Sequence, residues 1–308
     1  MDQAELRELL TPEGLALLDS LPAWESSSDV VRTVAALRKA GHSPGLVAAV
    51  MGQARLRARA SSKFGPFAAT MLFTEAGLEQ ATRLSVAALH AGRFQRAGVG
   101  WVADLGCGIG ADALALAALD IEVTAVERDE VTAAIAAYNL ASWSNARVEH
   151  GDAETFDISG VGGVYLDPAR RDGARRLADP ADWSPSLDFA FGLAERLPTG
   201  VKLGPGIDRD LIPVDAEAQW VSVDREVVEL GVWFGALARP GVRRSALVVG
   251  EHGTAELVAA ADSDDEPAGS LGEFLYEPDG AVIRARLIGD LARSLGGRTI
   301  AVDAPEDE

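Results

Sequence analysis

Three closely spaced glycines at the end of an apolar run are the strongest chemical signal in the sequence. The apolar run ends in Asp104, and the glycines follow at Gly106, Gly108 and Gly110, ahead of a helix-forming segment. A buried strand that turns into a helix through glycines brings its backbone close to a ligand. A second apolar run ends in Glu127, where a neighbouring parallel strand would finish. A carboxylate there can accept hydrogen bonds from both hydroxyls of a ribose, so the pattern predicts a nucleoside pocket.

The spacing of these glycines, G-x-G-x-G, differs from the dinucleotide fingerprint G-x-G-x-x-G. Asp104-Leu-Gly-Cys-Gly-Ile-Gly110 resembles motif I of the class I S-adenosylmethionine (SAM) dependent methyltransferases. The resemblance implies that Asp104 and the three glycines form the loop under the methionine part of SAM, and that Glu127 binds its ribose. A nicotinamide enzyme and a glycine-rich turn in an ordinary α/β domain are the alternatives. The acid at Glu127 argues against the ordinary turn, and the G-x-G-x-G spacing with Asp104 two residues ahead favours SAM over a nicotinamide cofactor.

The chain carries 47 acidic and 28 basic residues, which gives a formal net charge of −19. Such a charge disfavours binding of nucleic acid or anionic membranes over the whole surface, but it is compatible with a local basic face. The single cysteine, Cys107, cannot form an internal disulfide, and the four histidines have no cysteine partners at zinc spacing. We therefore expect no metal site and no need for an oxidising compartment.

Apolar residues make up 48% of the chain, as is typical of a globular protein with an ample core. The N-terminus lacks the basic and apolar regions of a signal peptide. No uncharged apolar stretch approaches the roughly 18 residues that a membrane helix needs. These features predict a cytoplasmic protein that does not bind membranes, and they leave its oligomeric state open.

The elements that position these residues fall into three regions. Residues 1–92 read as helices. Residues 93–260 alternate strands and helices, which predicts an α/β fold with a doubly wound sheet after an N-terminal helical domain. The resemblance to motif I implies that this sheet is the Rossmann-like sheet of class I methyltransferases. Residues 261–308 read as an acidic linker, a last helix over 281–295 and an acidic tail.

One helix of the first region carries basic residues in an otherwise acidic chain. The cap-and-proline pair Ser43-Pro44 begins it, and Arg57 and Lys63 lie toward its end. Favourable charge at the C-terminal end of a helix dipole explains such residues without any ligand. Contact with the phosphates of a nucleic acid explains them equally well, so Arg57 and Lys63 are candidate substrate-binding residues.

A short third strand over 147–150 ends at Gly151-Asp152-Ala153. In the methyltransferases that the chain resembles, an acid at this place hydrogen-bonds the adenine amino group. The resemblance therefore implies that Asp152 and Ala153 contact the adenine of SAM. A surface turn would use Gly-Asp equally well.

The fourth strand, over 163–166, ends in Asp167-Pro168. Ligands of a doubly wound sheet bind at the carboxyl ends of its strands, so this carboxylate can accept a hydrogen bond from a target amino group. The pair resembles the start of the Asp-Pro-Pro-aromatic motif of methyltransferases that act on base nitrogens. Ala169 and Arg170 depart from that motif, which leaves the target atom open. Arg170 can stack on a base plane or bind a phosphate.

Arg170 belongs to a second basic cluster, together with Arg171, Arg175 and Arg176. We interpret the last three as candidate substrate-binding residues beside the proposed site. The alternative is an arginine-rich loop that neutralises nearby acids. Trp183 follows the cluster and can either stack on a substrate or close the loop over the core.

Residues 1 to about 297 resemble a bacterial group of SAM-dependent methyltransferases that carry a C-terminal THUMP-like domain. The segments that carry the likeness are motif I, Lys63-Phe-Gly-Pro-Phe67, Met71-Leu-Phe-Thr74, Leu166-Asp-Pro-Ala-Arg-Arg171 and Gly272-Glu-Phe-Leu-Tyr-Glu-Pro-Asp279. The resemblance ends near residue 297 and implies that 261–308 begin a truncated THUMP-like region. Because THUMP modules are associated with RNA binding, it also implies an RNA substrate.

Together these patterns predict a SAM-dependent methyltransferase that modifies a base nitrogen of structured RNA, either ribosomal or transfer RNA. We assign the catalytic roles to Asp167, Pro168 and Arg170, with Asp167 and the Pro168 carbonyl orienting the amino group. A small-molecule or protein methyltransferase is one alternative, which the acidic net charge favours and the arginine clusters oppose. A catalytically silent SAM-binding interaction protein is another.

Overall fold

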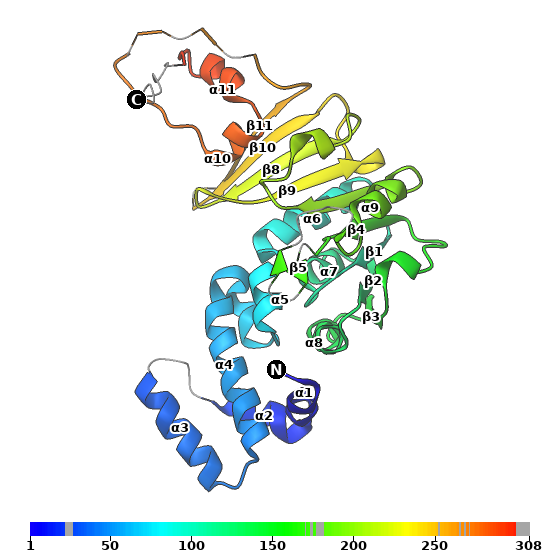
Figure 1. Ribbon diagram of the computed structural model, residues 1–308, viewed down its shortest axis with the longest axis vertical. Helices are drawn as coiled ribbons and strands as arrows, with labels where there is room; N and C mark the ends of the chain where they lie inside the picture. Colours follow the sequence, from blue (N-terminus) through cyan, green and yellow to red (C-terminus); the bar gives the residue numbers. More distant parts are fainter. Residues whose placement is uncertain are drawn as a thin grey trace. The chain divides into compact units, whose positions relative to one another are not determined.

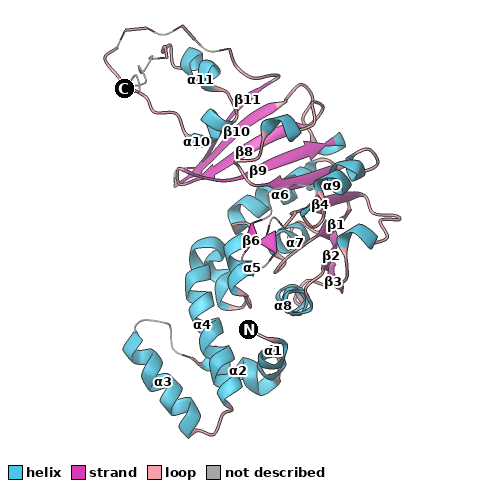
Figure 2. Cartoon of the chain, viewed as in Figure 1, coloured by secondary structure: helices cyan, strands magenta, loops and turns pink. Residues whose placement is uncertain are grey.

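The computed structural model describes residues 1–21, 27–169, 171–172, 175–176, 182–251, 253–264, 266–267, 269–270 and 272–299 (Figure 1). The chain divides into two compact units, Met1–Val164 and Tyr165–Glu308. The strands follow the order β11-β10-β8-β9-β7-β4-β1-β2-β3 in one sheet, with a separate pair β5-β6. The α/β fold expected from the alternating pattern is confirmed (Figure 2).

Helices make up the first part of the N-terminal unit. Thr11 and Ser43 each accept a hydrogen bond from a backbone N–H three residues on, and each precedes a proline in the first turn. The Ser43 cap begins its helix where the sequence predicts it, and Thr11 begins another helix in the same way. The helices of this part are α1 (Gln3–Leu9), α2 (Pro12–Ser20), α3 (Ser27–Lys39), α4 (Pro44–Phe64), η1 (Gly65–Ala69), α5 (Glu75–Gln80) and α6 (Leu84–Arg96).

Three parallel strands follow in the same unit. They are β1 (Trp101–Leu105), β2 (Glu122–Glu127) and β3 (Ala146–His150), with α7 (Ala111–Ala117) and α8 (Glu130–Leu140) as the crossover helices and η2 (Ala153–Thr155) after β3. Val102, Val123 and Ala125 are fully buried. Strands that are covered on both faces by crossover helices read as continuous apolar runs, which is why the sequence reveals them.

The C-terminal unit carries the antiparallel part of the sheet. Strand β4 (Gly163–Leu166) spans the division between the units, and β7 (Thr199–Leu203) follows α9 (Leu187–Ala194). The pairs β7–β9 and β8–β9 are antiparallel, β8–β10 is parallel, and β10–β11 is an antiparallel hairpin. The bounds are β5 (Arg171–Asp172), β6 (Arg175–Arg176), η4 (Arg209–Leu211), β8 (Glu217–Val223), β9 (Glu226–Phe234), η5 (Gly235–Leu237), β10 (Arg244–Gly250) and β11 (Gly253–Ala259).

The prediction of a single last helix over 281–295 is wrong. Two short helices occupy this stretch, α10 (Gly280–Arg284) and α11 (Ile288–Ser294). Between them Arg286 adopts a φ of 59°, in the left-handed region, and the following Leu287 is fully buried. A left-handed residue ends an α-helix, and burial of Leu287 accompanies the turn.

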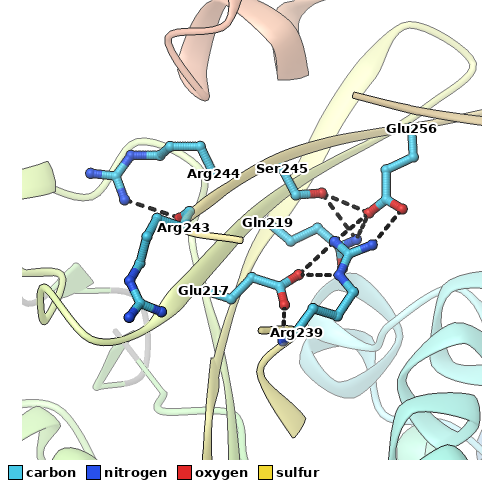
Figure 3. A network of polar contacts seen from close by, with 7 residues as sticks. All are labelled: Glu217, Gln219, Arg239, Arg243, Arg244, Ser245 and Glu256. Atoms are coloured by element: carbon cyan, nitrogen blue, oxygen red, sulfur yellow. Dashed lines mark hydrogen bonds and ion pairs between the residues drawn. The ribbon is translucent and has the colours of Figure 1, made fainter. Parts of the chain in front are cut away.

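A network of charged and polar side chains joins strands β8, β10 and β11 to Arg239, which lies between η5 and β10 (Figure 3). The Glu217 carboxylate is fully buried and accepts hydrogen bonds from the backbone N–H, Nε and Nη2 of Arg239 at 2.8, 3.1 and 2.6 Å. Arg239 also donates to Glu256, which accepts further bonds from Ser245 and Gln219. Although burial acts to raise it, the hydrogen bonds from Arg239 and Ser245 hold the pKa of Glu256 below its ordinary value.

Among the described residues, none of the helices combines the length and the apolar character that a membrane crossing requires.

Candidate functional site

The glycine loop between β1 and α7 depends on backbone conformations that side chains disfavour. Gly106, Gly108 and Gly110 have φ values of 88°, 55° and 86°, all in the left-handed region. The N–H groups of Gly106 and Cys107 donate to the Val126 carbonyl at 2.9 and 3.0 Å, which ties the loop to the end of β2. A side chain at Gly108 would meet open space. The loop therefore presents backbone beside room for a ligand.

Glu127, the last residue of β2, lies against this loop. One carboxylate oxygen accepts the Gly108 N–H at 3.0 Å, and the other accepts the Asp129 N–H at 2.8 Å. The side chain is half-buried. A carboxylate has about four acceptor positions, so each oxygen can accept another hydrogen bond from a ligand hydroxyl. The structure thus brings together the acid and the glycines that the sequence predicts to be neighbours.

The turn that follows β3 also lies beside the end of β2. The Gly151 N–H donates to the Glu127 carbonyl at 3.0 Å, which sets Asp152 and Ala153 beside the end of β2. Asp152 is exposed, and its carboxylate accepts the Glu154 N–H at 2.9 Å as the cap of η2. This is the turn role that the sequence leaves open as an alternative. The contact of Asp152 and Ala153 with adenine stays a prediction.

The side chains of Asp104 and Cys107 in motif I are buried and half-buried, respectively. Asp104 lies on β1 and is almost fully buried. Burial, together with the negative charges of Asp104 and Glu127, raises the pKa of the Cys107 thiol well above its ordinary value. The thiol therefore stays protonated at neutral pH, and Cys107 fills the turn rather than acting as a nucleophile.

The basic residues Arg57 and Lys63 bind the chain itself. Arg57 donates from Nε to the Met71 carbonyl at 2.9 Å and from Nη1 to Asp19 at 2.9 Å. The Lys63 ammonium donates to three carbonyls at the end of α5, those of Leu78, Glu79 and Ala81. These contacts give both residues a structural role within the chain, but through tertiary contacts rather than through the dipole of their own helix. Their contact with nucleic-acid phosphates stays a prediction.

In the C-terminal unit, Asp167 follows β4 and contacts Lys202 of β7. The Lys202 ammonium donates to the Asp167 carboxylate at 2.5 Å. Both side chains are partly exposed, Asp167 more than Lys202. Pro168 is buried, and the Ala169 N–H donates to the Ser184 carbonyl at 2.8 Å. This charge-assisted hydrogen bond fixes the position of the carboxylate.

Sequence reasoning missed Lys202. Its signal is a cation inside an otherwise apolar strand, between the buried Val201 and Leu203. A lysine there must direct its ammonium group toward an acceptor, because an isolated buried charge is costly. That acceptor is the proposed catalytic carboxylate.

The arginine cluster after Asp167 is described only in part. Arg170 lies outside the described residues. The backbones of Arg171, Arg175 and Arg176 belong to the β5–β6 pair, in which Arg171 is opposite Arg176. Trp183 is only 8% exposed, which favours its packing role over stacking on a substrate.

Within the described part of the chain, no three His, Cys, Asp or Glu side chains gather closely enough to hold a metal ion.

Residues 2–60 match the family model of a domain of unknown function (DUF8688). Over 252 residues the chain is 31% identical to an uncharacterized S-adenosylmethionine-dependent methyltransferase of Mycobacterium tuberculosis, found in strains CDC 1551 and H37Rv. This match covers 79% of the present chain and 67% of the mycobacterial protein.

Solved structures extend the likeness to the fold. A candidate methyltransferase from Porphyromonas gingivalis W83 is 21% identical with a TM-score of 0.67, over 96% of this chain and 79% of that one. An RNA methyltransferase from Salinibacter ruber, solved with S-adenosyl-L-homocysteine, is 17% identical with a TM-score of 0.34, over 50% and 92% of the two chains. At these levels the first structure bears on the fold alone, and the second does not bear on the substrate.

Proposed function

The chain belongs to the S-adenosylmethionine-dependent methyltransferases, and we propose that it methylates a base nitrogen of structured RNA, such as ribosomal or transfer RNA. The observation that carries the choice of target is Asp167, a carboxylate that Lys202 holds at the end of β4. Such a carboxylate can accept a hydrogen bond from the amino group of a base.

The described residues of the glycine loop fit the cofactor. Open space beside Gly108 leaves room for the methionine part, and the Glu127 carboxylate has acceptor positions for two ribose hydroxyls. Asp104, Gly106 and Gly110 shape the loop, and Asp152 with Ala153 would border the adenine. When bound, SAM supplies a methyl group on a positively charged sulfur.

Asp167 acts on the other reactant. Its carboxylate would accept a hydrogen bond from the target amino group, with the Pro168 carbonyl as a second acceptor. Bound SAM would supply its methyl group to the lone pair of this nitrogen and would leave as S-adenosyl-L-homocysteine. The nitrogen becomes positively charged before it loses a proton, so a fixed carboxylate stabilises that charge. The rest of the catalysis comes from orientation of the two reactants.

RNA as the substrate is supported by the arginines at 170, 171, 175 and 176 and by the resemblance to the group with a THUMP-like domain. In a chain of net charge −19, four arginines within seven positions provide a local basic segment that phosphates can bind. The same proposal includes domain boundaries at 92 and 260, the THUMP-like region and a cytoplasmic location.

The decisive experiment is mass spectrometry of RNA nucleosides from cells with and without the gene. We expect one methylated nucleoside to disappear with the gene and to return with the purified enzyme, SAM and the unmodified RNA. Unchanged RNA nucleosides, together with methylation of a protein or a small molecule, would contradict the RNA assignment. Proteins and small molecules are the substrates to assay next, because the acidic net charge favours them.

Replacement of Lys202 by methionine should lower kcat by about tenfold, because the Asp167 carboxylate loses a charge-assisted hydrogen bond. Affinity for S-adenosyl-L-homocysteine (SAH) should stay unchanged, and Lys202→Arg should recover part of the rate. Steady-state kinetics with calorimetry measure both quantities. An unchanged kcat in Lys202→Met would show that the contact does not serve the reaction.

A further inference from the structure

An extended, buried segment of the N-terminal unit lies between η1 and α5. Met71, Leu72 and Phe73 are at most 2% exposed, and they belong to no strand. Buried backbone N–H and carbonyl groups need hydrogen-bond partners, which a neighbouring strand would normally supply. For Leu72 and Phe73 the partners are side chains.

Two amide side chains form hydrogen bonds with the backbone of this segment, as a neighbouring strand would. Asn139 of α8 accepts the Leu72 N–H at 2.8 Å and donates to the Leu72 carbonyl at 3.0 Å. Gln53 of α4 accepts the Phe73 N–H at 3.0 Å and donates to the Phe73 carbonyl at 2.7 Å. Each amide presents one donor and one acceptor to one residue, so the segment is fixed in register.

Asn139 has a third contact, which reaches the glycine loop. Its amide nitrogen also donates to the carbonyl of Ile109 at 2.9 Å. Ile109 stands between Gly108 and Gly110, in the middle of the glycine loop, and it is buried. One amide group therefore holds both the Met71–Phe73 segment and the loop.

The helix that follows the segment contacts the same residue. A Cβ added to Gly77 of α5 would lie 2.4 Å from the Ile109 side chain. Only a glycine permits this approach, so α5 and the glycine loop are packed tightly at Ile109. Displacement of the segment would therefore displace the loop.

We propose that Asn139 is a positioning residue of the SAM site, which holds the glycine loop in its binding conformation by tying Ile109 to the Met71–Phe73 segment. The inference rests on the proposed cofactor site. It assigns to the N-terminal helices, through Gln53 and this segment, a share in cofactor affinity.

The test is an isosteric change, Asn139→Asp, with Asn145→Asp as its matched control. In either variant a carboxylate oxygen replaces an amide nitrogen that donates to two carbonyls, those of Leu72 and Ile109 or those of Ala117 and Ile121. Asn145 serves the start of β2 and Asn139 the loop. We expect the Kd for SAH, measured by calorimetry, to rise about tenfold or more in Asn139→Asp and to change less than about twofold in Asn145→Asp.

Equal affinities for SAH in Asn139→Asp and the wild-type protein would overturn the proposal. If the wild-type protein itself fails to bind SAH, the proposed cofactor site fails instead, and the two failures are distinguishable.

If Asn139→Asp does not fold, hydrogen exchange of the wild-type protein tests the proposal instead. Saturation with SAH should slow exchange at the amides of Leu72 and Phe73 together with those of residues 106–110. Slower exchange in the loop alone would show that the segment is not coupled to the cofactor, and would also overturn the proposal.

Discussion

Replacement of Asp167 by alanine should lower the rate of methyl transfer by about 10³-fold, while the affinity for SAH stays within about twofold of wild type. The carboxylate would no longer orient the target amino group or stabilise its developing charge, whereas the glycine loop and Glu127 stay intact. Single-turnover assays with labelled SAM measure the rate, and calorimetry measures the affinity.

Asp215→Ala is the matched control for this change. Asp215 is an exposed acid of the same unit, and its loss should alter neither quantity. Loss of SAH binding in Asp167→Ala would remove Asp167 from the catalytic role and assign it to the cofactor site.

The second large effect concerns stability. Arg239→Met should lower the free energy of unfolding by about 3 kcal/mol, because the fully buried Glu217 carboxylate loses two of its donors. The exposed pair of Arg225 and Glu277 offers the control, since Arg225→Met should leave stability unchanged. Denaturant unfolding at neutral pH compares the three proteins. Equal loss in both variants would mean that burial of Glu217 is not the cause.

The same network predicts a pH dependence. The folded-state pKa of Glu256 is depressed, so its pairing with Arg239 stabilises the fold fully above the unfolded pKa and is lost as pH falls toward the folded value. The stability difference between wild type and Arg239→Met should therefore be constant above about pH 5 and shrink below it. A difference that grows as the pH falls would contradict this assignment of charge.

Much of the fold could be predicted from the sequence, because its signals are local. The strands that end at Leu105 and Leu166 are apolar runs followed by a glycine and an acid, and the strand between them in the sequence ends in the acid Glu127. All three lie where the pattern places them. The proximity of Glu127 to Gly108 follows from neighbouring parallel strands, whose carboxyl ends meet.

The contacts that support the site could not be predicted, because they join residues far apart in the chain. Asn139 meets Leu72 across 67 positions, and Lys202 meets Asp167 across 35. A polar residue in a helix or strand gives no local sign of its partner. Arg57 and Lys63 show the same limit, since a basic residue that binds internal carbonyls reads like one that binds phosphate.

The most direct test of the central claim is a crystal structure of the protein with SAH at saturating concentration. We predict that both ribose hydroxyls lie within about 3 Å of the Glu127 carboxylate, with the amino-acid part beside Gly108. A ligand bound away from Glu127 and the glycine loop would contradict the account.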